Sequence, residues 1–442
     1  MNQIYYRNLI SGINVKVPLM DGSYCTAINF DNAATTPPFH SVIQQIIKFI
    51  PFYASVHRGA GYKCQFCTSM YEKTRKVVAK FVNADLDKST VIFVSNTTEG
   101  LNRLSNIFYE KYKKYVVLST DMEHHSNDLP WRKYELDYVP VDKYGRITLE
   151  NLEKKLKEYK GKVKIVTISG ASNVTGYRND IYKAAEIVHK YGAKIIVDGA
   201  QLVPHAEVNM RKGENNYIDY LVFSAHKMYA PFGGGALIGP KEELEKLEPD
   251  YKGGGTVDFV THDFVMWADD PLKDEPGTPN AIGAIALGTA IKTLQMLGMK
   301  NIEKHENSLV KYALYSLRNI PDLKLYCDKD NEAGHISVIS FNIEGVHHEI
   351  VAKILSYEFG IAVRTGCFCA EPYVQKLVGI TPEQMSDIIN EKVDPPGMVR
   401  VSLGLYNNQR EIDILVYALN KIVRNKQAYI DKYKSIDNSL FF

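Results

Sequence analysis

The sequence has little of what marks a secreted scaffold, a fibre or a membrane protein. Its 442 residues include six cysteines, too few for a disulfide framework. Lys and Arg number 53 against 51 Asp and Glu, without a long block of like charge, so we expect no binding to nucleic acid or to a membrane surface. The longest nearly apolar run, residues 281–291, is far shorter than the ~18 residues that suggest a membrane span. The start of the chain lacks a basic stretch followed by an apolar one, so we expect no export signal and a cytoplasmic protein.

What the sequence does contain is typical of a globular enzyme. Hydrophobic residues make up 45% and charged residues 24%, close to the average for soluble domains. A chain of this length can bury most of its apolar surface without disulfides or metals. We therefore expect two unequal domains or about three domains of ordinary size.

Short β-branched runs alternate with longer amphipathic stretches, which indicates an α/β protein with a mostly parallel sheet. Strands are predicted at residues 91–94, 115–118, 164–168, 194–197, 220–223 and 236–238. Helices are predicted at residues 68–82, 99–110, 148–159, 181–191 and 242–247, and longer helical patterns follow at 281–297 and 302–317.

Beyond Pro321 the pattern changes to that of a smaller α+β unit. Strands are predicted at 335–342, 362–365 and 398–403, and helices at 348–359 and 411–424. We therefore divide the chain into an N-terminal segment (1–29), a large domain (30–290) and a small C-terminal domain (291–442).

An acid and a lysine close two of the predicted strands. Asp198 ends one apolar run, and Lys227 follows another in the sequence Ser-Ala-His-Lys. Ligands of open α/β sheets bind outside the carboxyl ends of strands. Pyridoxal phosphate needs a lysine for its Schiff base and a carboxylate for its pyridine nitrogen. From these two residues alone, an ordinary ion pair at the sheet edge explains the pattern about equally well.

Two further strand ends carry polar groups. Thr97 and Thr98 stand at a helix start, where backbone N–H groups and hydroxyls suit a phosphate, although plain helix capping explains them too. His124 and His125 follow another strand, where an imidazole can stack on a cofactor ring or, by spacing alone, bind a metal.

Eight motifs in order resemble the class V aminotransferase-fold family, within it the cysteine desulfurase and selenocysteine lyase branch. They lie at residues 29–36, 56–59, 97–102, 122–127, 172–176, 197–201, 224–227 and 364–369. The resemblance implies the pyridoxal phosphate-dependent transferase fold of type I, with a large mostly parallel seven-stranded sheet and a smaller α+β domain. It also implies a homodimer with pyridoxal 5'-phosphate and no metal.

The resemblance assigns roles residue by residue. It implies Lys227 as the Schiff-base lysine, Asp198 on the pyridine nitrogen, Gln201 on the ring hydroxyl and His124 stacked on the ring. The phosphate would be held by Thr97, Thr98, Ser224, His226 and, from the partner subunit, Thr278. Substrate would be bound by His57, Asn173, Arg364 and Arg400, whose guanidinium fork suits a carboxylate.

Cys369 is the residue on which the resemblance to the cysteine desulfurase branch rests. Desulfurases place a catalytic cysteine at the end of an Arg-Thr-Gly-x-x-Cys segment, and Cys369 stands there. The implied reaction converts L-cysteine to alanine and leaves a persulfide on Cys369 for a sulfur-acceptor protein, with selenocysteine open as a substrate. The alternatives are an inert cysteine pair, or a C–S lyase, epimerase or aminotransferase on the same fold.

Two features depart from the family pattern. Cys367 and Phe368 precede Cys369 where many desulfurases have histidines, and a helix-like insert occupies residues 381–390 within 371–398. The roles of Cys64, Cys67 and Cys367 stay open. We expect Cys64-x-x-Cys67 to belong to helix packing, because no second pair occurs at zinc-site spacing.

Overall fold

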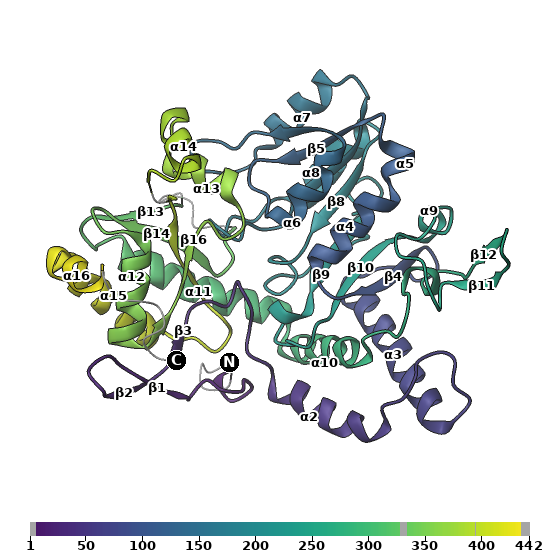
Figure 1. Ribbon diagram of the computed structural model, residues 1–442, viewed down its shortest axis with the longest axis horizontal. Helices are drawn as coiled ribbons and strands as arrows, with labels where there is room; N and C mark the ends of the chain where they lie inside the picture. Colours follow the sequence, from purple (N-terminus) through teal and green to yellow (C-terminus); the bar gives the residue numbers. More distant parts are fainter. Residues whose placement is uncertain (1–5, 328–333, 394, 435–442) are drawn as a thin grey trace.

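The computed structural model describes residues 6–327, 334–393 and 395–434. Two sheets with their own helices lie side by side (Figure 1). Among the described residues no single helix is both long and apolar enough to cross a membrane; α10 (Ala281–Leu297) and α11 (Met299–Leu317) meet both conditions only as a pair, which is bent by 78°.

In the part of the chain that the structure describes, the larger sheet has seven strands in the order β4-β10-β9-β8-β7-β5-β6. The pairs from β9 to β6 are parallel, whereas β10 runs antiparallel to both neighbours. The strands are β4 (Ser89–Val94), β5 (Val116–Thr120), β6 (Glu135–Val139), β7 (Val163–Ser169), β8 (Lys194–Asp198), β9 (Tyr220–Ser224) and β10 (Gly235–Pro240).

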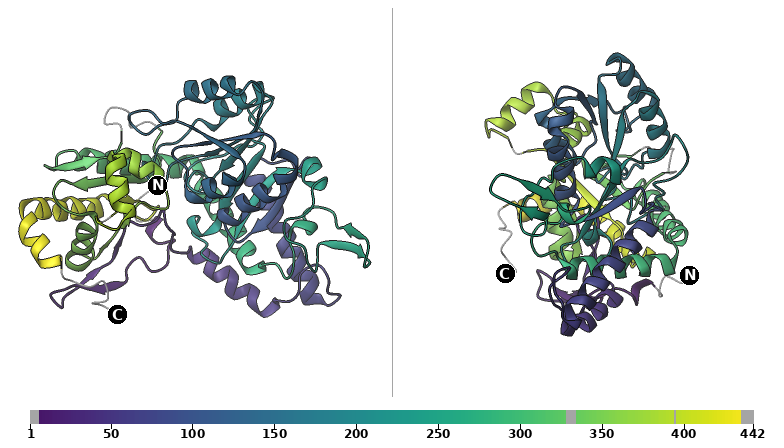
Figure 2. Two further views of the ribbon diagram at one scale, coloured as in Figure 1. Left: turned by 45° about the horizontal axis from the view of Figure 1, so that its top comes forward. Right: turned by 90° about the vertical axis from the view of Figure 1, so that its right-hand side faces the viewer.

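Helices cover both faces of this sheet, as a parallel sheet requires (Figure 2). They include α2 (His40–Phe49), α3 (Tyr62–Phe81), α4 (Thr97–Ile107), α5 (Tyr109–Tyr112), α6 (His125–Asp128), α7 (Leu149–Glu158), α8 (Ile181–Lys190), α9 (Lys241–Glu245) and α10 (Ala281–Leu297), with 3-10 turns η1 (Ile50–Phe52), η2 (Leu129–Lys133), η3 (Ala225–Lys227) and η4 (Leu272–Asp274). Helix α10 is apolar all round because it packs between α2 and α3, where twelve of its residues are buried.

The smaller sheet is antiparallel, in the order β13-β14-β17-β16. Its strands are β13 (Leu323–Leu325), β14 (Val338–Ile343), β16 (Arg364–Gly366) and β17 (Met398–Ser402), and its helices are α11 (Met299–Leu317), α12 (His348–Phe359), α13 (Glu371–Val378), α14 (Pro382–Ile389), α15 (Gln409–Arg424) and α16 (Lys426–Tyr433). The helix predicted in the insert is present as α14, begun by a capping box on Thr381.

The N-terminal segment packs against the smaller unit. Strand β3 (Ile28–Asn29) pairs in parallel with β15 (Ile361–Ala362), and Ile28 and Phe30 belong to the smaller hydrophobic core. Strands β1 (Lys16–Pro18) and β2 (Tyr24–Thr26) form a hairpin before it. A second hairpin, β11 (Val257–Val260) with β12 (Val265–Trp267), projects from the far end of the large unit (Figure 1). Residue 31, which follows β3, therefore lies at the junction of the two units.

Candidate active site

A cavity of about 600 Å³ lies where strand ends of the large sheet meet β16, β17 and the loop after β16. Twelve of the residues predicted for the site line it: Thr97, Thr98, His124, Asn173, Asp198, Gln201, Ser224, His226, Lys227, Arg364, Cys369 and Arg400. Because they come from residues 97–400, only the folded chain brings them together.

Lys227 and Asp198 reach the cavity from neighbouring parallel strands. Asp198 is the last residue of β8, and Lys227 ends the single turn η3 that follows β9. Burial lowers the pKa of Lys227 to about 8; Asp198 opposes that shift and Arg400 adds to it. Burial also raises the pKa of Asp198. An amine with a pKa near 8 is partly neutral at physiological pH, which a nucleophilic lysine requires.

His124 lies beside Lys227 as a neutral imidazole. It caps α6, and its Nδ1 accepts a hydrogen bond of 3.1 Å from the backbone N–H of Ser126. Burial, with a smaller contribution from the charge of Lys227, lowers the pKa of His124 to about 3. The ring is therefore uncharged and has Nδ1 fixed as an acceptor.

Hydroxyl groups and a helix N-terminus form one end of the cavity. The backbone N–H of Thr97, at the start of α4, donates to Oγ of Ser224 over 2.8 Å, and the two hydroxyls are 2.7 Å apart. The hydroxyl of Thr98 lies 2.7 Å from that of Ser126. Since α4 is eleven residues long and directs its positive end here, this part of the cavity suits a phosphate.

Two arginines occupy the side formed by the smaller sheet. Arg364 on β16 and Arg400 on β17 are direct partners across the antiparallel pair. Asp31 contacts both: its Oδ1 is 3.1 Å from Nη2 of Arg400, and its Oδ2 is 3.0 Å from Nη2 of Arg364. Arg400 is 3% exposed, and burial lowers its pKa to about 10. Its Nη1 donates to the carbonyl of Asn173, while Nε is buried without a hydrogen-bond partner.

The loop that carries Cys369 has an unusual backbone. Phe368 and Cys369 have φ angles of 54° and 55°, in the left-handed region that side chains disfavour. Hydrogen bonds hold this shape: the carbonyl of Cys369 accepts from His125 N over 2.7 Å, and that of Phe368 accepts from Nδ2 of Asn173 over 2.8 Å. The guanidinium of Arg400 lies 4.8 Å from the ring centre of Phe368. Cys369 itself is exposed.

The comparisons with known proteins agree with this arrangement. The family model described as Aminotransferase class-V matches residues 28–415. The chain belongs to this class-V aminotransferase family.

Two relatives of this chain are named cysteine desulfurases. A probable cysteine desulfurase of Halalkalibacterium halodurans is 36% identical over 403 residues, 89% of this chain and 92% of that protein. A cysteine desulfurase of Escherichia coli O8 is 34% identical over 405 residues, 89% and 93% of the two chains.

Solved structures confirm the predicted fold. The apo structure of a cysteine desulfurase from Thermococcus onnurineus NA1 has a TM-score of 0.81 and 32% identity, covering 90% of this chain and 95% of that one. A cysteine desulfurase from Escherichia coli in an S-sulfonic acid form has a TM-score of 0.80 and 26% identity, covering 96% and 99%. The α/β, pyridoxal phosphate-dependent transferase fold with its large, mostly parallel sheet is therefore established for this chain.

The residues that line this cavity fit pyridoxal phosphate. Lys227 and Asp198 supply the amine and the carboxylate, and the α4 end supplies an anion site. Gln201 is 4% exposed; its Nε2 donates to the carbonyl of Ala33, whereas its Oε1 is buried without a partner. A buried acceptor without a donor is costly, and a ring hydroxyl would satisfy it.

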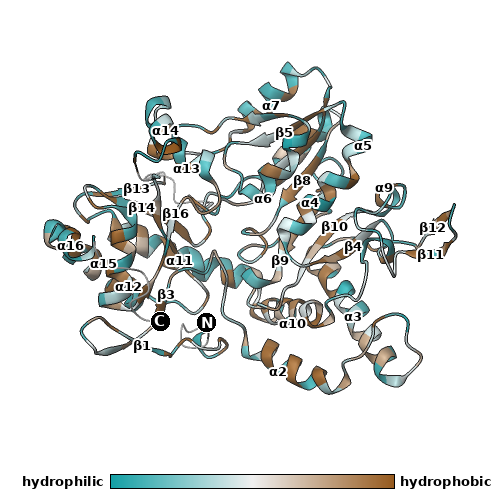
Figure 3. Cartoon of the chain, in the orientation of Figure 1, coloured by the Kyte–Doolittle hydropathy of each residue, from teal (hydrophilic) through white to brown (hydrophobic). Residues whose placement is uncertain are grey.

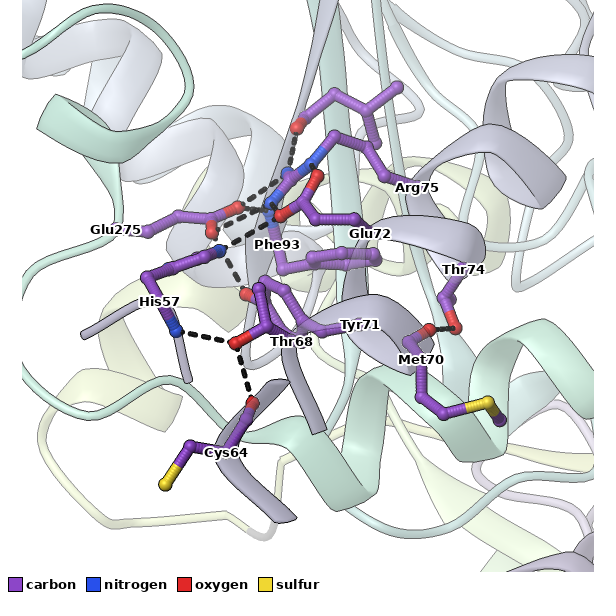
Figure 4. A network of polar contacts seen from close by, with 11 residues as sticks. His57, Cys64, Thr68, Met70, Tyr71, Glu72, Thr74, Arg75, Phe93 and Glu275 are labelled. Atoms are coloured by element: carbon purple, nitrogen blue, oxygen red, sulfur yellow. Dashed lines mark hydrogen bonds and ion pairs between the residues drawn. The ribbon is translucent and has the colours of Figure 1, made fainter. Parts of the chain in front are cut away.

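His57 and Thr278 do not line this cavity within a single chain. They line a second one of about 330 Å³, together with Arg58 and Gly277. A polar network, buried at Arg75 and Glu275 and partly exposed at His57 and Glu72, joins its two sides (Figure 4). Nε2 of His57 contacts Glu72 at 2.9 Å, Glu72 pairs with Arg75, and Arg75 binds Glu275 through both terminal nitrogens at 2.8 and 3.0 Å. Their predicted roles as substrate and phosphate ligands stay predictions.

Two acids that contact residues of the cavity received no role from the sequence. Asp31 lies in the first of the family motifs, and Glu123 precedes His124. Glu123 is buried, which raises its pKa to about 7, and it accepts hydrogen bonds of 2.6 Å from Ser169 and from Asn127. It thereby ties the His124 loop to the end of β7. Their place within two of the motifs is the only signal that the sequence offers.

Proposed function

We propose that this chain is a pyridoxal phosphate-dependent cysteine desulfurase that converts L-cysteine to L-alanine and holds the sulfur as a persulfide on Cys369. The observation that carries the proposal is one cavity lined by Lys227, Asp198 and His124 from the large sheet and by Cys369 from the loop after β16. The names of the relatives over about nine-tenths of the chain support the same activity.

The cofactor, when bound, would supply a protonated pyridine ring that draws electrons from the substrate carbons. Asp198 would hold the ring nitrogen, Gln201 the ring hydroxyl, and Thr97, Thr98, Ser224 and His226 the phosphate. Lys227, with a pKa of about 8, can take up and release protons near neutral pH. Arg400 would bind the substrate carboxylate, since its buried Nε still lacks an acceptor.

Cys369 then takes the sulfur. Its thiolate Sγ forms a bond to the substrate sulfur, the bond between Cβ and sulfur breaks, and the electron pair left at Cβ takes up a proton to give alanine. The persulfide can pass to a thiol of an acceptor protein because Cys369 is exposed. Cys367 is unsuited to this role, since burial raises its pKa to about 11 and its Sγ lies 3.1 Å from the carbonyl of Pro396.

A homodimer would complete the site. Thr278 lies outside the cavity of its own chain, so its predicted contact with a phosphate requires another subunit. Large apolar side chains are exposed on α2, on η1 and the residue after it, and at the start of α3, a surface suited to burial between subunits: Ile47, Ile50, Phe52, Tyr53 and Tyr62. Figure 3 shows this hydrophobic colouring along α2.

The test measures alanine and sulfide formed from L-cysteine in the presence of a reductant. We expect Cys369→Ala to lose both products while keeping the yellow cofactor, Lys227→Ala to lose products and Schiff-base absorbance, and the matched control Cys367→Ala to stay active. Full activity of Cys369→Ala, or no reaction of the wild type with cysteine, would overturn the proposal in favour of a lyase, epimerase or aminotransferase.

The same assay tests the shared site. Lys227→Ala and Thr278→Ala are each expected to be weak alone. Unfolded and refolded together, they should recover up to about a quarter of wild-type activity, because half of the chains form mixed dimers and each mixed dimer has one intact site. No recovery from a mixture that has formed dimers would contradict the exchange of Thr278.

A further inference from the structure

Arg75 and Glu275 form a buried ion pair beside the segment that carries Thr278 (Figure 4). Their side chains are 6% and 3% exposed, and two hydrogen bonds of 2.8 and 3.0 Å join the guanidinium to the carboxylate. The hydroxyl of Tyr71 on α3 donates to the same carboxylate over 2.9 Å. Since each lost bond would leave part of a buried charge unpaired, this carboxylate is held in one orientation.

The ion pair also binds the outer edge of the large sheet. Among the described residues no strand pairs with the outer side of β4, the first strand in the sheet order. The N–H of Phe93 in β4 donates to Oε1 of Glu275 over 2.7 Å, and the carbonyl of Val91 accepts from Nη1 of Arg75. The ion pair therefore takes the place of a further strand and connects α3 and β4 to the segment of Thr278.

The segment between η4 and α10 lies outside helices and strands and depends on such contacts. Glu275 follows η4, and Asn280 caps the start of α10. Between them, the N–H of Gly277 donates to the carbonyl of Gly254 over 2.7 Å. Thr278 therefore takes its position from the anchored ends of a short segment, and Glu275 is the end held by charge.

A shift of this segment should act on the second cavity. Thr278 lines that cavity with His57 and is not among the residues that line the cavity of Lys227 in the same chain. Thr97 of the Lys227 cavity follows β4 and so lies near the ion pair in sequence, but β4 pairs with β10 at six positions. A change at the ion pair should therefore displace the irregular segment rather than the strand.

We propose that Arg75 and Glu275 are positioning residues that hold Thr278 for the phosphate-binding end of the cavity in the partner subunit. The inference rests on the proposed function, which gives that cavity a pyridoxal phosphate and the dimer an exchanged Thr278. It adds that the ion pair of each chain serves the site of the other subunit and not its own.

The first test measures the affinity of the apo protein for pyridoxal phosphate by absorbance titration. Glu275→Gln keeps the size and one acceptor oxygen but removes the charge that orients the guanidinium of Arg75. We expect the affinity to fall about tenfold, as for the loss of one hydrogen bond to a charged group. Arg75→Lys should lower it by less, because lysine keeps the charge but not the two parallel donors.

The matched control is Glu411→Gln. Glu411 is also buried and bonded to an arginine, Arg7 at 2.6 Å, but it lies on α15 in the smaller unit. We expect Glu411→Gln to lower the melting temperature and to leave the affinity for pyridoxal phosphate unchanged.

The second test asks which site of the dimer the ion pair serves. Glu275→Gln and Lys227→Ala are unfolded and refolded together, and alanine formation is measured at a cofactor concentration near the wild-type dissociation constant. In a mixed dimer, the chain that keeps Lys227 receives an unaltered Thr278 segment from its partner. We expect the mixture to form alanine about three times faster than the same chains refolded separately.

A second mixture is the control for this design. Glu275→Gln refolded with Thr278→Ala should show no gain, since both substitutions act on the site of the other subunit and no pairing restores one. If Glu275→Gln does not fold, as judged by melting temperature and dimer size, Arg75→Lys takes its place in the same mixtures.

Unchanged cofactor affinity in a folded Glu275→Gln protein would overturn the inference. So would the absence of a gain with Lys227→Ala where Thr278→Ala does gain, because the ion pair would then act on its own chain. No gain for either mixture would show that Thr278 is not exchanged and would overturn the inference as well. Failure of the proposed function has a different signature: the wild type would form no alanine from L-cysteine, while the cofactor titrations would still decide the role of the ion pair.

Discussion

Two regions of the cavity differ in construction: the strand ends of the large sheet and the loop that carries Cys369. Asp198 and Ser224 end buried strands and Lys227 follows within one turn, so regular hydrogen bonding fixes them. Cys369 is exposed and lies in a loop with two successive left-handed residues, held by contacts from other segments. Proton transfer needs groups at fixed places away from water, whereas a persulfide must be reachable by another protein.

The largest effects should come from substituting the residues at the strand ends of the large sheet. Asp198→Asn is expected to lower turnover by roughly 10²-fold, because the ring nitrogen would lose its anionic partner. It should also lower the pKa of Lys227 below about 8, since Asp198 raises that pKa more than Cys369 and Asp31 do, whereas Arg400→Gln should raise it. The neutral amine reacts with the aldehyde of pyridoxal phosphate, so the rate of cofactor uptake by the apo protein increases with pH through this pKa.

The measurement is the pH midpoint of that uptake rate, followed by absorbance. Opposite displacements for Asp198→Asn and Arg400→Gln would show that the large sheet and the smaller sheet act on Lys227 in opposite directions. Displacement in the same direction for both variants would contradict this electrostatic account.

A smaller effect is expected from removing a hydrogen bond that holds the loop of Cys369. Asn173→Ala removes the 2.8 Å hydrogen bond to the carbonyl of Phe368, which costs about 1 kcal/mol and should lower the rate of persulfide formation on Cys369 about fivefold. Cofactor absorbance should not change, because Asn173 holds the loop and not the strand ends. Rapid-quench detection of the persulfide measures the step, and a loss of cofactor instead would show that the two regions are not separable in this way.

The same contrast explains what the sequence could predict. Asp198, Ser224 and Lys227 were predictable because apolar runs mark β8 and β9 and the chemistry follows directly. Strand β6 was not predicted, since Glu135–Val139 at the sheet edge has only one buried residue. The predicted strand 362–365 is two strands, β15 and β16, that pair with β3 and β17. The contacts of Asp31 are with arginines more than 330 residues away, and no local pattern records such contacts.

The smallest effect is expected at two asparagines that cap helices. Comparing them separates a loss of folding stability from a loss of cofactor binding. Asn96 caps α4 and lines the cavity, whereas Asn408 caps α15 in the smaller unit; each side chain accepts from the N–H three residues on, at 2.9 and 3.1 Å.

Replacing either asparagine by alanine should cost about 1 kcal/mol of the free energy of unfolding, because one helical N–H loses its acceptor. Only Asn96→Ala should also weaken the affinity for pyridoxal phosphate, since α4 is the helix whose N-terminus faces the proposed phosphate site. Urea unfolding and cofactor titration on both variants measure the two quantities. Equal cofactor affinity in both variants would show that Asn96 does no more than cap its helix, and the phosphate would then depend on the hydroxyls of Thr97, Thr98 and Ser224.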